Sequence, residues 1–469
     1  MKQFFILMLV CITAVVHAQP KILYYQPTSA EFAARKIPAS DLRLDVKHWM
    51  QVMEESHVNL YHAISKEKLQ LEADRLLSVV PDSVSHAEAT LLVSKLAAML
   101  NEGHVGLAAH PVTDSLYAWK AERFPYFLRG IDSGGFVIGQ DLSNRYPKLA
   151  PGDKIISMNG VNAFELYKNY AQYFGGLDTW KKVSVKDAIR KLLFMDNITA
   201  PFTIAAKQGN DTVHFTVQGF TRQQADSINR SLPSLLAPPE PFVLRFIPGN
   251  IAVIEFNDMY GGLKNQFAGF LDSSFKLIKA RKAKGLVIDI RKNGGGDSDL
   301  GDMLISYFNG KPYRNMSGVK VKVSEHARAL AKLRGQDYSF EDWKNGTIYE
   351  YKVRNLITPA KRAERFVGKT AVLIGPGTFS SANMLANAIK DYKLATLFGE
   401  STAEPGNDFG EVFPFMLPRT HIIATAPVKM FVRANGNDKD FEGIRPDVVV
   451  KSSANGTDEV LEAAVKWML

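Results

Sequence analysis

The feature that most constrains the fold is an alternation of continuous apolar runs with helical segments in the second half of the chain. The apolar runs read IAVIEF at 251–256, GLVIDI at 285–290, TAVLIG at 370–375 and LATLFG at 394–399. Helical patterns lie between them, at 273–283, near 299–308 and at 381–391. Strands that are apolar on both faces and alternate with helices predict a mostly parallel sheet covered by helices, an α/β fold. Ligand sites in such sheets gather where strands end and helices begin.

Two different textures precede this core. From about 41 to 101 the apolar residues recur every three or four positions, which predicts a small helical unit, and SVSHAEA at 83–89 offers a serine cap with Glu88 nearby. From 122 to 218 short β-like runs are broken by turn pairs, among them Asn159-Gly160, which predicts a β-rich module. The proline-rich SLLAPPEPF at 234–242 suits a linker.

The N-terminus reads as a secretory signal peptide. Lys2 precedes an apolar run from Phe4 to Val16, and small residues before Gln19 provide a cleavage pattern. The run is too short for a membrane span, and no later segment approaches that length. Cys11, the single cysteine, leaves with this segment, so the exported protein is expected to contain no disulfide. We therefore expect a periplasmic or extracellular protein without stable membrane insertion.

The charge balance argues against a nucleic-acid partner. The chain has 57 Lys and Arg against 48 Asp and Glu, a formal charge of +9, but the basic residues are scattered along it. A nucleic-acid footprint is normally concentrated on one element or face. A solvated basic surface is the simpler interpretation.

One strand end carries consecutive glycines. GLVIDIRKNGGGDSD ends a buried strand with Asp289 and Arg291 and then places Gly294, Gly295 and Gly296 in a row. Such a run can turn backbone N–H groups toward a bound group, or it can be only a tight turn. No Gly-Lys-Ser/Thr follows, so the run is not a phosphate-binding loop.

A second strand end presents two serines. TAVLIGPGTFSS leads from a strand into a helix, with Ser380 and Ser381 at the junction. A serine there can cap the helix, or it can be a nucleophile beside the free N–H groups of the helix N-terminus. A serine nucleophile needs a base. His104, in AAMLNEGHVGLAAH, is expected in a turn after a helix, where it suits general-base chemistry, and no metal-ligand spacing surrounds it.

Taken in order, these segments resemble the tail-specific (C-terminal processing) serine proteases. The resemblance is carried by NEGHVGL, PGDKIISMNG, GLVIDIRKNGGG, GTFSSANMLANAIKDYKLATLFGEST and FEGIRPDVVV, and it spans nearly the whole mature chain. It implies an endopeptidase whose core resembles the crotonase and ClpP folds, with a PDZ-like domain inserted after a helical N-terminal part. The expected organisation is signal peptide 1–18, helical region 19–118, PDZ-like domain 119–220, linker 221–245 and α/β protease core 246–469.

The resemblance also implies roles for individual residues. Ser380 matches the nucleophile, and the N–H groups of Ser381 and Gly295 match the two oxyanion donors. The better-known branch pairs its serine with a lysine, but this chain has Pro405 at that position in GESTAEPGNDFGE. It looks more like the tricorn-core branch, in which a histidine from the N-terminal part is the base, and His104 matches that histidine.

The resemblance also implies an acid that orients the histidine. In NGNDKDFEGIRPD its position favours Asp440, with Glu442 second and Asp438 third, although a solvated turn would also explain all three. No metal or organic cofactor is implied.

Two other functions stay open at this stage. The chain could be a peptide-binding protein of the same architecture without catalysis, which the missing lysine would favour. It could also act on esters or acyl-thioesters, although a Gly-x-Ser-x-Gly elbow is absent. The expected partner is a peptide or unfolded protein, and proteases of this kind often assemble into oligomers.

Overall fold

The computed structural model describes residues 22–469 except 121, 144, 222, 225–226, 228–238, 336–341 and 453–456. The expected signal peptide and much of the expected linker lie outside the described residues. Within the described part, no helix combines the length and the apolar composition that crossing a bilayer requires.

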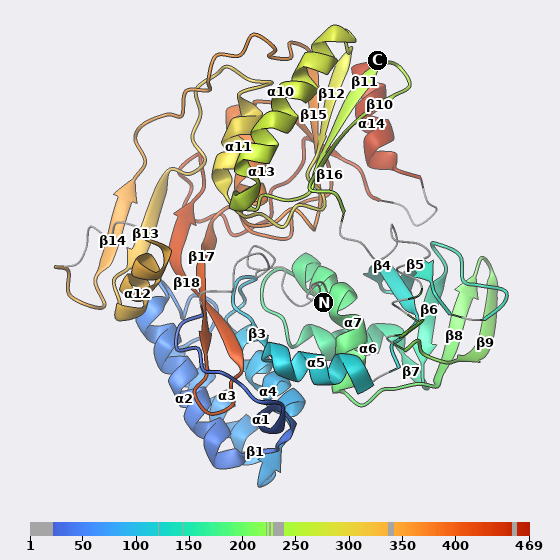
Figure 1. Ribbon diagram of the computed structural model, residues 1–469, viewed down its shortest axis with the longest axis vertical. Coiled ribbons are helices and arrows are strands. Elements are labelled where there is room, and N and C mark those ends of the chain that lie inside the picture. The colour runs from blue at the N-terminus through green and yellow to red at the C-terminus, as the bar shows by residue number, and fades with distance from the viewer. Residues whose placement is uncertain are drawn as a thin grey trace.

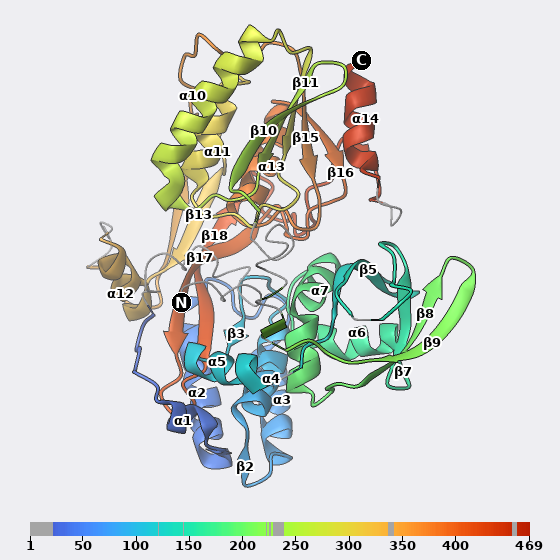
Figure 2. The same ribbon diagram turned by 45° about the vertical axis from the view of Figure 1, so that its right-hand side comes forward.

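A six-stranded sheet forms the centre of the C-terminal half (Figures 1 and 2). Its spatial order is β10 (Phe242–Ile247), β11 (Ile251–Phe256), β12 (Gly285–Asp289), β15 (Lys369–Ile374), β16 (Thr396–Gly399) and β19 (Val448–Val449). The strands from β11 to β19 pair in parallel, and β10 pairs antiparallel at the edge. The apolar runs of the sequence therefore form the parallel strands that they predict.

Helices cover both faces of this sheet. The larger core packs against α10 (Lys264–Ala280), α11 (Ser298–Ile305) and α13 (Ser381–Tyr392). The short 3-10 helix η2 (Gly261–Leu263) directly precedes α10. The smaller core on the other face packs against α14 (Glu459–Met468). Because strands buried on both faces must be covered by helices, the continuous apolar character of β11, β12 and β15 follows from this layering.

The N-terminal part is helical. It comprises α1 (Ala30–Ala34), α2 (Ala39–Ser56), α3 (Lys66–Ser78), α4 (His86–Ala98) and α5 (Pro111–Lys120), with short strands β1 (Ile37–Pro38), β2 (Ser83–Val84) and β3 (Leu107–Ala108). The expected cap of α4 is present: the Ser85 hydroxyl accepts from the Glu88 N–H, and the Glu88 carboxylate accepts from the Ser85 N–H.

The middle part is β-rich. The sheet order is β4 (Tyr126–Asp132), β5 (Gly135–Asp141), β6 (Lys154–Met158), β8 (Phe202–Gln208) and β9 (Asp211–Val217), with β7 (Val161–Asn162) beside β6. Asn159 and Gly160 take positive φ values, 49° and 79°, in the expected turn. The helices α6 (Ala163–Ala171) and α7 (Asp178–Met195) pack against this sheet. The mixed α/β organisation with a helical N-terminal part and a β-rich insertion is thus confirmed.

A further antiparallel sheet joins the two halves of the chain. Its order is β14 (Ile348–Lys352), β13 (Gly318–Lys322), β18 (Ile423–Val432) and β17 (Asp408–Met416), and β3 pairs with β18. Helix α12 (Glu325–Arg334) follows β13. Buried residues of β17 and β18 share one apolar core with α2, α3 and α4. Because β3 follows His104 closely in the chain, its pairing with β18 ties the histidine segment to the C-terminal half. No sequence pattern predicts this sheet.

Candidate active site

Ser380 occupies a sharp turn between β15 and α13. It is the residue before the first turn of α13, with φ 51° and ψ −126°, and its side chain forms no capping hydrogen bond. A non-glycine residue with such backbone angles is strained and is typical of functional turns between a strand and a helix. The hydroxyl of Ser381 does not cap the helix either, since it donates to the Gly296 carbonyl at 2.6 Å. The interpretation of these serines as helix caps is therefore wrong.

The glycine turn after β12 packs directly against this serine turn. Phe379 N–H donates to the Asn293 carbonyl at 3.0 Å, and the Thr378 hydroxyl donates to the Ile290 carbonyl at 2.9 Å. Gly295 has φ +92°, and a Cβ built on it would lie 2.7 Å from Ser380 Cβ. Only a residue without a side chain fits this conformation and this spacing. The run of glycines is therefore a close backbone approach to the serine.

His104 comes from the N-terminal part and meets Ser380. Its Nε2 lies 3.3 Å from Ser380 Oγ, although the two residues are 276 positions apart in the chain. The imidazole is buried, with 6% of the residue exposed, and its ring centroid lies 4.8 Å from that of Phe379. The His104 carbonyl accepts from the Thr425 hydroxyl on β18 at 2.9 Å. The joining sheet thus holds the histidine loop against the serine turn.

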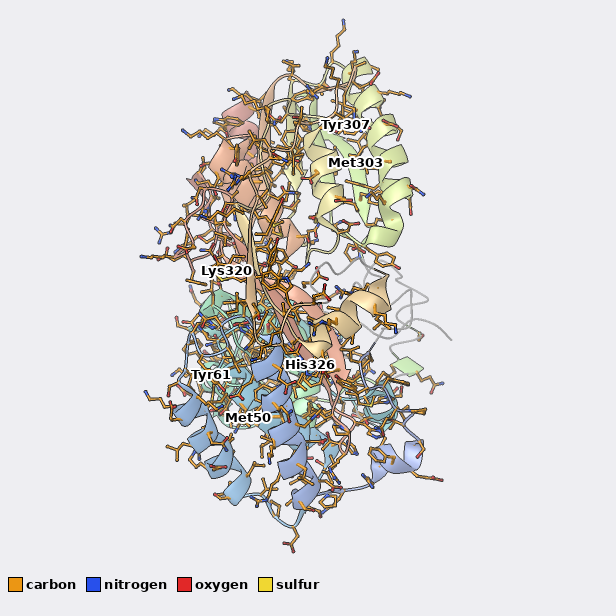
Figure 3. The ribbon with its side chains drawn as sticks, turned by 90° about the vertical axis from the view of Figure 1, so that its left-hand side faces the viewer. Met50, Tyr61, Met303, Tyr307, Lys320 and His326 are labelled. Atoms are coloured by element: carbon orange, nitrogen blue, oxygen red, sulfur yellow. The ribbon has the colours of Figure 1, made fainter. Side chains whose placement is uncertain are left out.

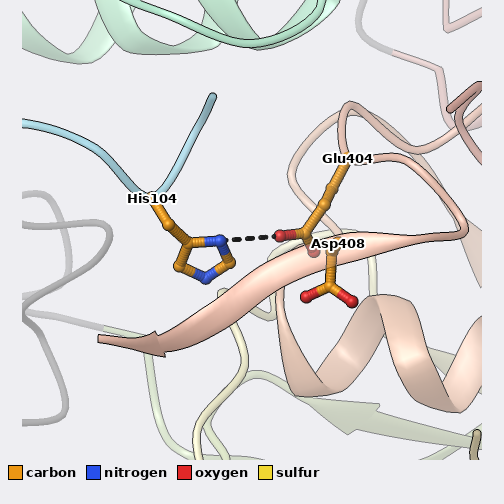
Figure 4. A group of neighbouring side chains, drawn as sticks. All are labelled: His104, Glu404 and Asp408. Atoms are coloured by element: carbon orange, nitrogen blue, oxygen red, sulfur yellow. Dashed lines mark ion pairs between the residues drawn. The ribbon is translucent and has the colours of Figure 1, made fainter. Parts of the chain in front are cut away.

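The carboxylate that faces His104 belongs to Glu404. Its Oε1 lies 3.1 Å from His104 Nδ1, within ion-pair distance although not aligned as a full hydrogen bond, and the side chain is 3% exposed. Its Oε2 accepts from the N–H of Ser380. Figure 4 draws the pair, with Asp408 beside it. One carboxylate therefore touches both the imidazole and the backbone of the serine.

The carboxylate of Asp440, the expected acid, has other partners than His104. Its carboxylate forms an ion pair with Arg433 and accepts from the Glu442 N–H at 3.1 Å. Glu442, the second choice, pairs with Arg445 at 2.7 Å and its side chain is 71% exposed, while Asp438 is exposed. The expectation that an acid from 438–442 contacts the histidine is thus corrected, because Arg433 holds Asp440 and the loop before β17 supplies the carboxylate. Glu404 directly precedes Pro405 in the chain.

The acidic surroundings control the protonation of His104. Burial by itself lowers the pKa of the imidazole, but the negative charge of Glu404, with smaller contributions from Asp408 and Glu102, outweighs burial and raises it above the ordinary value. Burial and the neighbouring Glu404 raise the pKa of Asp408 well above its usual range, and His104 opposes this. Asp408 therefore keeps its proton to a higher pH than an exposed aspartate does.

The expected oxyanion donors lie next to Ser380. The Gly295 N–H donates to Asn293 Oδ1 at 2.9 Å, and Asn293 Nδ2 in turn donates to the Phe256 carbonyl at 2.9 Å. Ser381 is the first residue of α13, where backbone N–H groups have no partner inside the helix. The structure therefore brings Ser380, His104, Ser381 and Gly295 together, whereas the carboxylate of Asp440 pairs with Arg433.

The same carboxylates belong to a group of side chains of the metal-ligating types. Within the described ranges, His104, Glu404 and Asp408 are the group whose ligand atoms all lie within 4.8 Å of one another. Nδ1 of the imidazole is already paired with Glu404, and Nε2 faces the serine hydroxyl. These contacts match the geometry of a base held between an acid and an alcohol.

Comparisons with known proteins identify a peptidase domain and proteins of the same fold. Residues 250–450 match the model of a family described as peptidase family S41. The chain is similar to mature CPAF, with 14% identity and a TM-score of 0.60 over 92% of this chain and 96% of that one. For mature CPAF complexed with lactacystin the identity is 15% and the TM-score 0.61, over 92% and 97% of the two chains. The photosystem II D1 C-terminal processing protease is 14% identical, with a TM-score of 0.46 over 91% and 96%.

The family match confirms a peptidase S41 domain in residues 250–450. At such low identity the CPAF structures establish a common fold, while the family model covers both strand ends that form the site. The structure adds the buried pair of His104 and Glu404 beside Ser380. Residues 250–450 therefore form a domain of peptidase family S41, and the protein is a serine-type peptidase.

Proposed function

We propose that the protein is an endopeptidase that cleaves peptide bonds with Ser380, His104 and Glu404. One observation carries the proposal: the His104 ring has Nε2 3.3 Å from the Ser380 hydroxyl and Nδ1 3.1 Å from Glu404. A base between a nucleophile and an orienting acid is the arrangement that serine peptidases need.

The geometry supports a definite sequence of proton transfers. With its proton on Nδ1, facing Glu404, the neutral His104 accepts the Ser380 proton at Nε2 while Oγ attacks the peptide carbonyl carbon. The C–N bond then breaks, and Nε2 returns the proton to the leaving amine. Water hydrolyses the acyl-enzyme by the same route. Glu404 fixes the tautomer of the imidazole and stabilises the imidazolium.

Two backbone N–H groups are proposed to stabilise the oxyanion. The Ser381 N–H stands at the N-terminus of α13, where the helix dipole favours negative charge. The Gly295 N–H is the second donor, and it must exchange Asn293 Oδ1 for the substrate oxygen when the intermediate forms. The 2.6 Å hydrogen bond from the Ser381 hydroxyl to the Gly296 carbonyl keeps the two turns in register.

We further propose that the β-rich part is PDZ-like and captures extended peptide, and that the mature protein acts after export. An exposed sheet edge binds peptides by adding their backbone as a strand. The proposed limits remain 119–220 for this part and 246–469 for the protease core, and cleavage after Ala18 is expected to leave Gln19 as the mature N-terminus. N-terminal sequencing of the exported protein tests that cleavage.

A fluorophosphonate probe tests the proposed nucleophile. We expect labelling of wild type at Ser380, loss of labelling in Ser380→Ala, and retained labelling in the matched neighbour Ser381→Ala. An unfolded protein substrate should be cut internally by the enzymes that label. Labelling that survives in Ser380→Ala would refute the assignment.

Substrate class can be tested with the same variants. Wild type and His104→Ala should be compared on a peptide and on an ester of the same acyl group. Turnover of the ester without cleavage of the peptide would assign the site to ester chemistry and contradict the proposal.

A further inference from the structure

A second buried histidine–carboxylate cluster lies two residues before His104. The carboxylate of Glu102, whose side chain is 5% exposed, has Oε1 2.8 Å from Nε2 of the fully buried His57 and 3.3 Å from Nδ1 of His62. Neither histidine belongs to the site described above. Burying a carboxylate has a desolvation cost, which the two imidazole partners of Glu102 offset.

The hydrogen bonds fix how His57 contacts Glu102. Nδ1 of His57 accepts from the Asn59 N–H at 3.0 Å, so the proton of the neutral ring is on Nε2, which donates to Glu102. His57 directly follows Ser56, the last residue of α2, and its own N–H donates to the Met53 carbonyl. The Glu102 carboxylate is thus tied to the end of α2.

The backbone around Glu102 is held on its other side by the β-rich part. A Cβ on Gly175 would lie 2.5 Å from the Glu102 carbonyl oxygen, and a Cβ on Gly103 would lie 2.8 Å from Phe379 Cζ. The Phe379 ring stacks on Trp180 of α7 at 3.9 Å. The backbone of Glu102 and Gly103 is therefore closely packed on this side, and we expect a shift of Glu102 to move His104.

We propose that Glu102 is a positioning residue for His104: its side chain, anchored by His57 and His62, holds the loop that presents the imidazole to Ser380. This inference rests on the proposed function of Ser380 and His104. It assigns Glu102 no contact with substrate, and it differs from Glu404, which touches the imidazole directly.

Charged and titratable groups surround both His104 and Glu102. Glu404 and Asp408 face His104 from the loop before β17 and from β17 itself, and Glu102 acts from its own loop. His57 and His62 face Glu102 from the end of α2 and the loop that follows. Because the charge of Glu102 contributes to the raised pKa of His104, neutralising Glu102 should make His104 a weaker base at the same geometry.

The experiment compares three variants by the pH profile of kcat/KM for peptide cleavage and of the rate of labelling by a fluorophosphonate. Glu102→Gln removes the charge, and we expect the acid limb to move to lower pH and the plateau to fall about tenfold through misplacement of the imidazole. Glu102→Asp keeps the charge but shortens the side chain, so the plateau should fall while the acid limb stays near that of wild type.

Glu55→Gln is the matched control. Glu55, whose side chain is 46% exposed, also lies near the end of α2 and pairs with a histidine, His326, at 2.9 Å, and the other ring nitrogen of His326 lies 2.6 Å from the hydroxyl of Tyr24, outside the site. Figure 3 labels His326 on α12 and Met50 on α2, the two helices that this pair joins. Glu55→Gln should leave both the plateau and the acid limb unchanged.

The outcomes separate this inference from the proposed function. An acid limb that stays in place in Glu102→Gln, or moves equally in Glu55→Gln, overturns the role of Glu102 while labelling of Ser380 still supports the peptidase. If Glu102→Gln fails to fold, the inference rests on Glu102→Asp, and an unchanged plateau in that variant overturns it. Labelling that persists in Ser380→Ala instead overturns the proposed function itself.

Discussion

The molecule contains two buried histidine–glutamate pairs that look alike and are placed differently. His57 and Glu102 are 45 residues apart, and both lie in the helical N-terminal part. His104 and Glu404 come from opposite halves of the chain and meet beside a serine in a strained turn. Both glutamates are almost completely buried.

The difference lies in the second nitrogen of each ring. Nδ1 of His57 is occupied by the backbone N–H of Asn59, so both ring nitrogens are engaged within the helical part. Nε2 of His104 faces a hydroxyl. A buried histidine–carboxylate pair therefore becomes a candidate for catalysis only when the free nitrogen meets a group that can give up a proton.

We expect removal of the Ser380 hydroxyl to have the largest effect on catalysis, because Nε2 of His104 then faces no group that can give up a proton. We expect Ser380→Ala to lower kcat by about 10⁴-fold or more, as loss of a nucleophile typically does. Peptide cleavage at saturating substrate measures this. Thermal unfolding should be unchanged within a few degrees, and a comparable loss in His57→Gln would contradict the distinction between the pairs.

Neutralising Glu404 should have the next largest effect. Glu404→Gln is expected to lower kcat by about 10³- to 10⁴-fold because the tautomer is no longer fixed and the imidazolium is no longer stabilised. Since Glu404 raises the pKa of His104, the acid limb of the profile should also move to lower pH. A profile measured on the residual activity checks the sign, and a shift to higher pH would refute the assignment.

Breaking the first pair should affect stability more than chemistry. His57→Gln leaves the buried Glu102 without its nearest partner, which should lower the free energy of unfolding by about 3 kcal/mol. We expect kcat/KM to fall only about tenfold, through displacement of the His104 loop. Denaturant unfolding and peptide cleavage on the same preparation provide the two values. An activity loss as large as that of Glu404→Gln would remove the contrast.

Asp440→Asn tests the acid that the sequence favours. Because Asp440 pairs with Arg433 and not with His104, we expect kcat/KM within about threefold of wild type and a stability loss of at most about 1 kcal/mol, the usual range for partly exposed ion pairs. A loss of activity near 10³-fold would restore Asp440 as the acid.

Asp408→Asn should have the smallest effect, a change in the free energy of unfolding that depends on pH. A carboxyl whose folded-state pKa is raised contributes stability that is complete below its unfolded pKa and is lost as pH rises through the folded pKa. The asparagine variant lacks this loss, so its free energy of unfolding relative to wild type should increase with pH. Unfolding curves at acidic and alkaline pH measure the trend, and a decrease would contradict it.

Much of the fold can be predicted from the sequence because local patterns specify it. The apolar runs that form β11, β12 and β15 are read as buried strands without any contact information. The cap of α4 and the Asn159-Gly160 turn also depend on neighbouring residues alone. The joining sheet of β13, β14, β17 and β18 escapes such reasoning, because its strands are distant in the chain and its pairing depends on long-range register.

Within the site, the sequence by itself determines Ser380 and His104 as candidates. Ser380 follows an apolar strand and precedes a helix, and His104 stands in a turn after another helix. Their side-chain chemistry and local setting can be recognised in one segment at a time.

Only the tertiary structure decided that Glu404 is the acid beside the histidine. The chain contains 48 acidic residues, and nothing in the letters around Glu404 distinguishes its carboxylate from that of Asp440. The choice depends on where the loop before β17 passes the serine turn, and on Arg433, which holds Asp440. Side-chain type is a property of sequence, but the distance between two charges is set by the packing of the whole fold, and at such close range it controls the pKa.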